Sequence, residues 1–377
     1  MDSKRTVKKW GLAAGSLIIL LLAVQPVSHA VFAVRLALSL QKLAAGATEQ
    51  ITEVRRAKVR RRMGNQDLDA LLYYPAKSPA VSAIVLVAGL SEQGCYHPRL
   101  IALSRLLAER GMLVLTPDVR EFRDFKISPE AINQILFWHT QIPTVEGGGK
   151  IRNIGLAGIS FSGTMAMIAA AQPEIRDKVA FIVSIGPYSN LIRCTRGWFA
   201  AGPITVTGDY YPTRYYARWI AMLAAVDMIE SDTDRRFLES LLHNLLLQKD
   251  APPAPADLTA AGSRWYAVAT MREDQSDPGL SNSIEAHLVS HVYTKLDPEA
   301  AVRNLHCPVF LIHGAYDDLI PPEESLELHQ TLARSYLLIS PFLTHTHPTD
   351  RTLSLGQKAK AAVDTLLFSY SLSREIR

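Results

Sequence analysis

The amino-acid sequence predicts an α/β protein in which a mostly parallel sheet carries helices on both faces. Short and almost fully apolar runs, typical of strands buried on both faces, occur at 82–89, 179–185 and 309–313. Segments with apolar residues at helical spacing, such as 98–110 and 128–140, lie between strands of this kind. Strands and helices that alternate in this way are typical of a parallel sheet with crossover helices.

The other elements of the sheet are predicted in the same way. Residues 55–74 indicate two strands joined by a turn at 63–66, and 112–116 is a further apolar strand. Near the end of the chain, a helix at 323–333 precedes a strand at 336–340, and a helix at 357–370 follows.

One long stretch, residues 191–302, interrupts the alternation, because it contains helical and aromatic segments but no clear buried strand. We expect a helical insertion that lies over the carboxyl ends of the strands and caps a site there. The alternative is an accessory that only packs on the core. Its aromatic residues, Trp198 among them, are expected to pack the insertion on the core, with the lining of an apolar acyl pocket as the alternative.

Composition limits the classes of function. The chain has 377 residues, 48% apolar and 20% charged, which suits a globular protein with a sizeable core. The net charge of +4 is uneven: residues 1–62 hold 12 Lys and Arg against 3 acids, and the remainder holds 28 against 33. The folded body is therefore mildly acidic, which argues against nucleic acid as a partner. Oligomeric state stays open.

The cysteines are too few and too widely spaced for a metal site or a disulfide framework. The chain has three, Cys95, Cys194 and Cys307. We expect neither a metal nor an organic cofactor.

The first 48 residues have the composition of a membrane-addressing segment. Basic residues at 4–9 precede an apolar run that extends, with a break at 25–26, to residue 34. We expect an uncleaved, single-pass N-terminal anchor, because apolar character continues beyond the small-residue pattern at 28–30. The alternative is a signal peptide cleaved there, which would leave a secreted or periplasmic protein.

The strongest catalytic signal lies in residues 151–172. An apolar, β-prone run leads into Gly158-Ile-Ser160-Phe-Ser162-Gly163, and a helix of small residues follows. A serine on a strained turn between strand and helix requires small neighbours, which Gly158, Ser162 and Gly163 provide. Ser160 is therefore the candidate nucleophile.

A second motif follows the strand at 309–313, where Gly314, Asp317, Ile320 and Pro321 form the pattern Gly-x-x-Asp-x-x-Ile-Pro. With this motif and the serine turn, residues 55–375 resemble an α/β-hydrolase. The resemblance implies a core in two parts, 55–190 and 303–377, with the helical cap insertion of 191–302 between them.

The resemblance also implies the roles of individual residues. The family's triad order of serine, acid and histidine makes Asp317 the acid, in preference to Asp318. His345 is the expected base because it follows the last strand as Thr-His, with His347 as the alternative. Backbone amides of Leu90 and Phe161 are the candidate oxyanion-hole donors.

The expected activity is hydrolysis of acyl esters through a Ser-His-Asp triad and an acyl-enzyme, as in carboxylesterases and lipases. A thioesterase, peptidase or acyltransferase would use the same triad and remains an alternative. A further alternative is a non-catalytic, membrane-tethered binding protein on a hydrolase fold.

Overall fold

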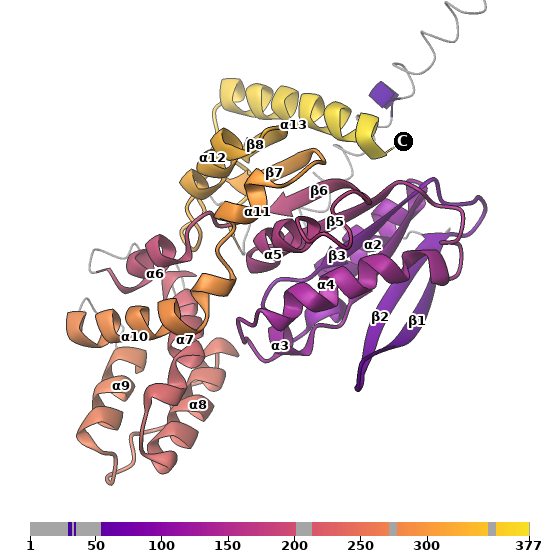
Figure 1. Ribbon diagram of the computed structural model, residues 1–377. Helices are drawn as coiled ribbons and strands as arrows, with labels where there is room; N and C mark the ends of the chain where they lie inside the picture. Colours follow the sequence, from indigo (N-terminus) through magenta and orange to yellow (C-terminus); the bar gives the residue numbers. More distant parts are fainter. Residues whose placement is uncertain are drawn as a thin grey trace, which may run out of the picture.

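The computed structural model describes residues 29–31, 34, 54–200, 213–270, 277–345 and 352–376. Its described part contains an eight-stranded sheet with strand order β1-β2-β4-β3-β5-β6-β7-β8 (Figure 1). The strands are β1 (Val54–Met63), β2 (Gln66–Pro75), β3 (Ser82–Val87), β4 (Met112–Pro117), β5 (Ile154–Ile159), β6 (Val179–Ile185), β7 (Val309–Gly314) and β8 (Ser335–Ser340).

The sheet is antiparallel at one edge and parallel elsewhere. β1 and β2 form a hairpin whose register runs from Val54 opposite Pro75 to Met63 opposite Gln66. β2 pairs with β4 in the antiparallel sense, and every pair from β4 to β8 is parallel. The expected mostly parallel sheet is therefore confirmed.

Helices connect the strands and also fill the stretch between β6 and β7. They are α2 (Pro98–Glu109), α3 (Arg120–Arg123), α4 (Glu130–Gln141), α5 (Phe161–Ala170), α6 (Leu191–Phe199), α7 (Thr213–Ala224), α8 (Asp232–Leu246), α9 (Ala260–Thr270), α10 (Pro278–His291), α11 (Glu299–Arg303), α12 (Pro322–Thr331) and α13 (Leu355–Ile376). The last helix is longer than the predicted 357–370.

Two hydrophobic layers enclose the sheet, because side chains alternate between its faces. In β3, Ala83, Val85 and Val87 belong to the cluster that includes α4 and α5, whereas Ile84 and Leu86 belong to the cluster that includes α2 and α13. Helices thus cover both faces, as expected for strands that are buried throughout (Figure 1).

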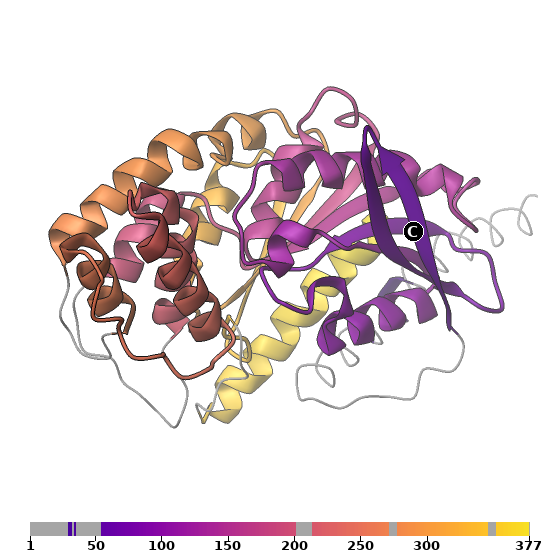
Figure 2. The same ribbon diagram turned by 90° about the horizontal axis from the view of Figure 1, so that it is seen from below.

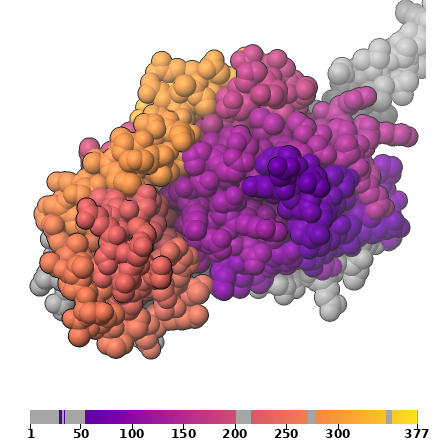
Figure 3. Space-filling model, turned by 60° about the horizontal axis from the view of Figure 1, so that its bottom comes forward, coloured from indigo at the N-terminus to yellow at the C-terminus, as the bar shows by residue number. Residues whose placement is uncertain are grey.

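The helices between β6 and β7 gather on the side of the molecule away from the β1–β2 hairpin (Figures 1 and 2). In the space-filling view they form a lobe against the core (Figure 3). Two side chains of this lobe contact loops that follow parallel strands. The Tyr216 hydroxyl donates to the Leu90 carbonyl at 3.2 Å, and the Trp198 indole donates to the Leu319 carbonyl at 2.6 Å. The lobe therefore contacts the carboxyl edge of the sheet.

The expectation of an N-terminal membrane anchor is wrong for the described residues, where no helix is both long and apolar enough to cross a membrane. A span needs about 20 consecutive apolar residues. The one described helix of sufficient length is α13, and its 22 residues include Lys358, Lys360, Asp364, Arg374 and Glu375. Of residues 1–48, the structure describes 29–31 and 34, which are helical, so most of the expected anchor lies outside the described residues.

Close packing between β5 and β6 predicts the effect of adding one methyl group to the core. A Cβ at Gly155 would lie 2.4 Å from the ring of Phe181, which is fully buried. Gly155→Ala is expected to lower the free energy of unfolding by about 1–3 kcal/mol, measured by denaturant titration, because the ring must move.

The matched control is Gly356→Ala in α13, where an added Cβ meets nothing within 4 Å. This variant is expected to leave stability unchanged or to raise it by less than about 1 kcal/mol, since alanine favours helix. Equal stabilities for the two variants would contradict the packing described here.

Candidate active site

Ser160 lies at the turn between β5 and α5, and its backbone is strained. Its φ of 61° and ψ of −130° are values that residues with a side chain rarely adopt. Such a conformation costs on the order of 1–3 kcal/mol, so the surrounding structure must hold it. The Ser160 amide donates to the Ile185 carbonyl at 2.6 Å, which fastens the turn to the end of β6. This is the backbone of a nucleophile elbow.

The small residues of the elbow are required by close contacts. A Cβ at Gly158 would lie 2.2 Å from the Ser162 carbonyl oxygen, and one at Gly163 would lie 2.4 Å from the Ser184 hydroxyl. The Ser162 hydroxyl accepts from the Ile159 amide at 2.7 Å and donates toward the Val87 carbonyl at 3.1 Å. Ser162 therefore ties the elbow to the carboxyl end of β3.

The loop after β3 passes directly beside the serine. A Cβ at Gly89 would lie 3.2 Å from the Ile159 carbonyl oxygen and 3.6 Å from Ser160 Cβ. Leu90 is the next residue, and its carbonyl accepts the bond from Tyr216. Phe161 is the first residue of α5, at the end of the helix where the dipole is positive. Both candidate oxyanion donors thus belong to segments that adjoin Ser160.

Asp317 is buried in the loop after β7 and forms several hydrogen bonds. Its Oδ1 accepts from the amides of Leu319 and Ile320, each at 3.0 Å, and its Oδ2 accepts from His345 Nδ1 at 2.8 Å. Burial alone would raise the pKa of Asp317. The charge and hydrogen bonds of His345 and His313 outweigh burial and hold that pKa well below its usual range. Asp317 is therefore an ionised carboxylate at neutral pH.

Two glycines lie beside the pairing of Asp317 with His345. Gly186, just after β6, has a φ of 63°, which favours glycine, and a Cβ there would be in ordinary van der Waals contact, at 3.7 Å, with both Asp317 Oδ2 and His345 Nδ1. A Cβ at Gly314 would lie 2.4 Å from the Leu343 carbonyl oxygen. The segment that leads to His345 can therefore run against the end of β7.

His313, in β7, supports the loop that carries Asp317, residues 315–321, which we call the acid loop. Its Nε2 lies 2.7 Å from the Ile320 carbonyl and 3.4 Å from Asp317 Oδ2, and its Nδ1 lies 2.6 Å from the Ser325 hydroxyl. A carbonyl can only accept, so Nε2 carries a proton. This fully buried histidine holds the loop in place and contributes to the low pKa of Asp317.

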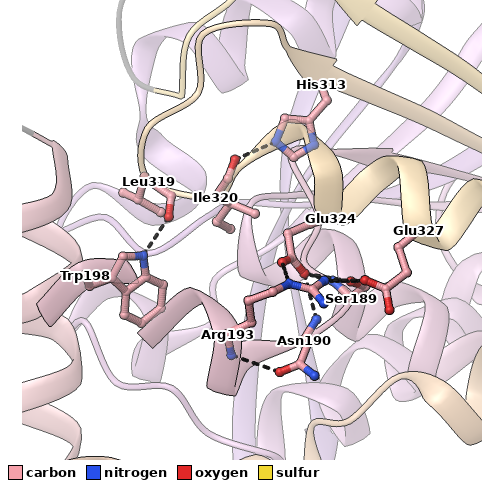
Figure 4. Close-up of polar contacts among 9 residues, drawn as sticks. All are labelled: Ser189, Asn190, Arg193, Trp198, His313, Leu319, Ile320, Glu324 and Glu327. Carbon is pink, nitrogen blue, oxygen red and sulfur yellow. Dashed lines mark hydrogen bonds and ion pairs between the residues drawn. The ribbon is translucent and has the colours of Figure 1, made fainter. Parts of the chain in front are cut away.

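A second buried carboxylate, Glu324, fastens α12 to the loop after β6 (Figure 4). Its Oε2 accepts from the Ser189 and Asn190 amides, each at 2.8 Å, and from the Ser189 hydroxyl at 2.7 Å. Its Oε1 pairs with Arg193 Nε at 2.6 Å. Burial tends to raise the pKa of Glu324, but Arg193 and Ser189 outweigh it and lower that pKa. Arg193 also pairs with Glu327, which is half exposed.

The structure places the predicted site residues in two groups, one around Ser160 and one around Asp317. Ser160 is on the elbow, Leu90 and Phe161 adjoin it, and Asp317 bonds to His345. Asp318 is exposed, whereas Asp317 is buried. His347, the alternative base, lies outside the described residues.

Sequence reasoning missed the support of the acid loop. No motif in the sequence gives His313 a role in the site, and its position four residues before Asp317 is the one signal that could have linked the two. Glu324 and Trp198 contact residues more than 100 positions away in the chain, so no local pattern indicates their roles.

Within the described ranges, no group of three or more His, Cys, Asp or Glu residues is placed to hold a metal ion. Cys95, Cys194 and Cys307 are buried free thiols.

Comparison with known proteins identifies the family. Residues 134–347, more than half of the chain, match the sequence profile described as X-Pro dipeptidyl-peptidase (S15 family). The chain belongs to the S15 family. Its fold is that of the α/β-hydrolases, which confirms the resemblance inferred from the elbow and acid motifs. No curated protein sequence matches the chain.

Solved structures similar to this S15-family chain include peptidases and esterases. An acylaminoacyl peptidase from Pyrococcus horikoshii superposes with a TM-score of 0.50 at 17% identity, covering 87% of this chain and 42% of that one. Est1E from Butyrivibrio proteoclasticus gives a TM-score of 0.47 at 16% identity, covering 85% of this chain and 98% of that one. The chain thus spans about two fifths of the acylaminoacyl peptidase, and the likeness shows the fold.

The lowered pKa values of the buried carboxyls Asp317 and Glu324 predict how stability depends on pH. Folding lowers the pKa of Glu324 from its ordinary value of 4.5, so the unfolded chain binds more protons in acid. The contribution of Glu324 is therefore fully present above pH 4.5 and is lost as pH falls through its folded-state pKa. Glu324→Gln is expected to lose about 1.5–3 kcal/mol at pH 7, because hydrogen bonds to a charged group are lost.

The control is Glu327→Gln, which removes a half-exposed partner of the same arginine. It is expected to change stability by less than about 1 kcal/mol. Urea unfolding at pH 7 and pH 4 should show a smaller pH effect in Glu324→Gln than in the wild type. An undiminished pH effect would contradict the assignment.

Proposed function

We propose that this S15-family serine hydrolase cleaves acyl esters with Ser160 as nucleophile, His345 as base and Asp317 as the orienting acid. The observation that supports it most is the 2.8 Å contact between His345 Nδ1 and the ionised, buried Asp317, in a chain that also holds a serine at a φ of 61° between β5 and α5. A base oriented by a carboxylate and a serine on an elbow are the parts that acyl transfer requires.

The proposed reaction has two halves. Ser160 Oγ attacks the acyl carbonyl while His345 Nε2 takes the hydroxyl proton, and Asp317 stabilises the imidazolium through Nδ1. The amides of Leu90 and Phe161 stabilise the tetrahedral oxyanion, aided by the N-terminus of α5. His345 then protonates the leaving alkoxide as the acyl-enzyme forms. Water, deprotonated by His345, attacks the acyl-enzyme, and Ser160 recovers its proton as the acid leaves.

The buried carboxylates favour a substrate whose acyl group carries no positive charge. The buried carboxylates among the described residues are Asp234, Asp317 and Glu324. Each is bonded to protein groups: Asp234 to Thr259, Asp317 to His345 and Glu324 to Arg193. None of these three is available to bind the ammonium group of a peptide N-terminus, whereas a simple ester requires no such partner.

The second candidate is a peptidase, which the S15 match favours. That family is described by its X-Pro dipeptidyl-peptidase activity, and the triad chemistry would be the same. An amine leaving group needs protonation by His345 more than an alkoxide does, so the two activities can be separated by substrate.

The proposal is tested with p-nitrophenyl acetate and p-nitrophenyl butyrate against Ala-Pro-p-nitroanilide, using the full chain. We expect both esters to be hydrolysed with a kcat/KM larger than that of the anilide. Ser160→Ala and His345→Ala are each expected to lower kcat by about 10⁴-fold.

His347→Ala is the matched control, since it removes the neighbouring histidine and is expected to retain ester hydrolysis. If His347→Ala abolishes activity and His345→Ala does not, the base is misassigned. A larger kcat/KM for the anilide would favour the peptidase, and hydrolysis by Ser160→Ala at the wild-type rate would refute the mechanism.

A further inference from the structure

We propose that Trp198, in the helical region between β6 and β7, is a positioning residue for the catalytic acid. The inference rests on the proposed function and adds to it a residue that touches none of the reacting atoms. It follows from a hydrogen-bonded path that runs from the indole of Trp198 through one peptide group to Asp317. Figure 4 shows the first step of this path, the bond from Trp198 to Leu319.

The path passes through the peptide group between Leu319 and Ile320. Its carbonyl oxygen, on Leu319, accepts from the Trp198 indole N–H at 2.6 Å. Its amide, on Ile320, donates to Asp317 Oδ1 at 3.0 Å. A peptide group is planar and rigid, so holding its carbonyl also sets the direction of its N–H. Trp198 therefore helps to aim one of the two amides that hold the Asp317 carboxylate.

Electrostatics reinforces this geometry. A donor at the carbonyl polarises the peptide group and makes its N–H a stronger donor, and this effect is larger in a buried site. Trp198 is 1% exposed and Asp317 is 6% exposed, so water does not screen the path. Without the indole N–H, the Leu319 carbonyl would be a buried acceptor that has lost its partner. The peptide would then be free to reorient, and Asp317 with it.

Trp198 has neighbours at its ring and at its backbone. The centroid of its ring lies 6.1 Å from that of Phe161, the residue after Ser160. The backbone carbonyl of Trp198 accepts from Arg218 Nε of α7 at 3.1 Å, and Arg218 is also buried. Trp198 thus lies between the nucleophile elbow and the acid loop, and α7 fixes its backbone.

A second buried tryptophan offers a matched control. Trp219 of α7 donates its indole N–H to the Ala269 carbonyl of α9 at 2.9 Å and is 3% exposed. Its environment resembles that of Trp198 in burial and in bonding to a carbonyl. Its bond, however, joins two helices of the insertion and does not reach the acid loop.

The test compares Trp198→Phe with Trp219→Phe in the hydrolysis of p-nitrophenyl acetate. Losing a hydrogen bond that serves a charged group is expected to lower kcat of Trp198→Phe about tenfold, with KM unchanged. Trp219→Phe is expected to keep the wild-type kcat and KM. Thermal unfolding of both variants shows whether they are equally destabilised.

A second pair of variants isolates the N–H. Benzothienylalanine, incorporated in place of Trp198 or of Trp219, keeps the bicyclic ring and lacks the donor. The same loss of kcat at position 198 alone would support the inference, including in the case where Trp198→Phe fails to fold. Wild-type kcat with this residue at 198 would overturn it, as would a change confined to KM, which would indicate a pocket-lining role.

Ser160→Ala distinguishes a failure of the inference about Trp198 from a failure of the proposed function. If Ser160→Ala is inactive and the variants at 198 match those at 219, the inference fails and the proposed function stands. If Ser160→Ala hydrolyses the ester at the wild-type rate, both fail.

Discussion

The buried carboxylate of Asp317 is the group on which the arrangement of this site depends. An ionised carboxylate that is 6% exposed is stable only when its oxygens are bonded, and here two backbone amides and His345 supply the bonds. The side chains that contact Asp317 or the loop that carries it come from separate parts of the chain. His313 belongs to the core strand β7, Trp198 to the helical insertion, and His345 to the segment after β8. The acid loop is therefore the place where these parts meet.

The strain at Ser160 is accommodated in a similar way. Its positive φ is unfavourable in isolation, and bonds from Ile185 and through Ser162 to Val87 fasten the elbow to the strands on either side. The sheet thus supports Ser160, while the insertion contacts the loop after β3 through Tyr216 and the loop after β7 through Trp198. A lobe that contacts these loops can help to orient the residues they carry as well as cover a site.

Local patterns in the sequence were enough to predict the elbow and the acid motif. The elbow and the acid motif are short and follow buried strands, so Ser160 and Asp317 could be assigned from a few neighbouring residues. Trp198 could not be, because its partner Leu319 is 121 positions away and buried aromatic residues usually pack without a specific role. His345 and His347 both follow the last strand, and spacing alone does not separate them. The expectation of an N-terminal anchor is wrong for the described residues, where no helix is both long and apolar enough to cross a membrane.

In the function that we propose, Ser160, Asp317 and His345 act as one catalytic unit. A double-mutant cycle tests it most directly: kcat is measured for Asp317→Asn, for His345→Ala and for the combined variant, each against p-nitrophenyl acetate. If Asp317 acts through His345, its replacement has no further effect once the histidine is gone, and the double variant should be as slow as His345→Ala. Losses that multiply would show that the two residues act independently and would contradict the account.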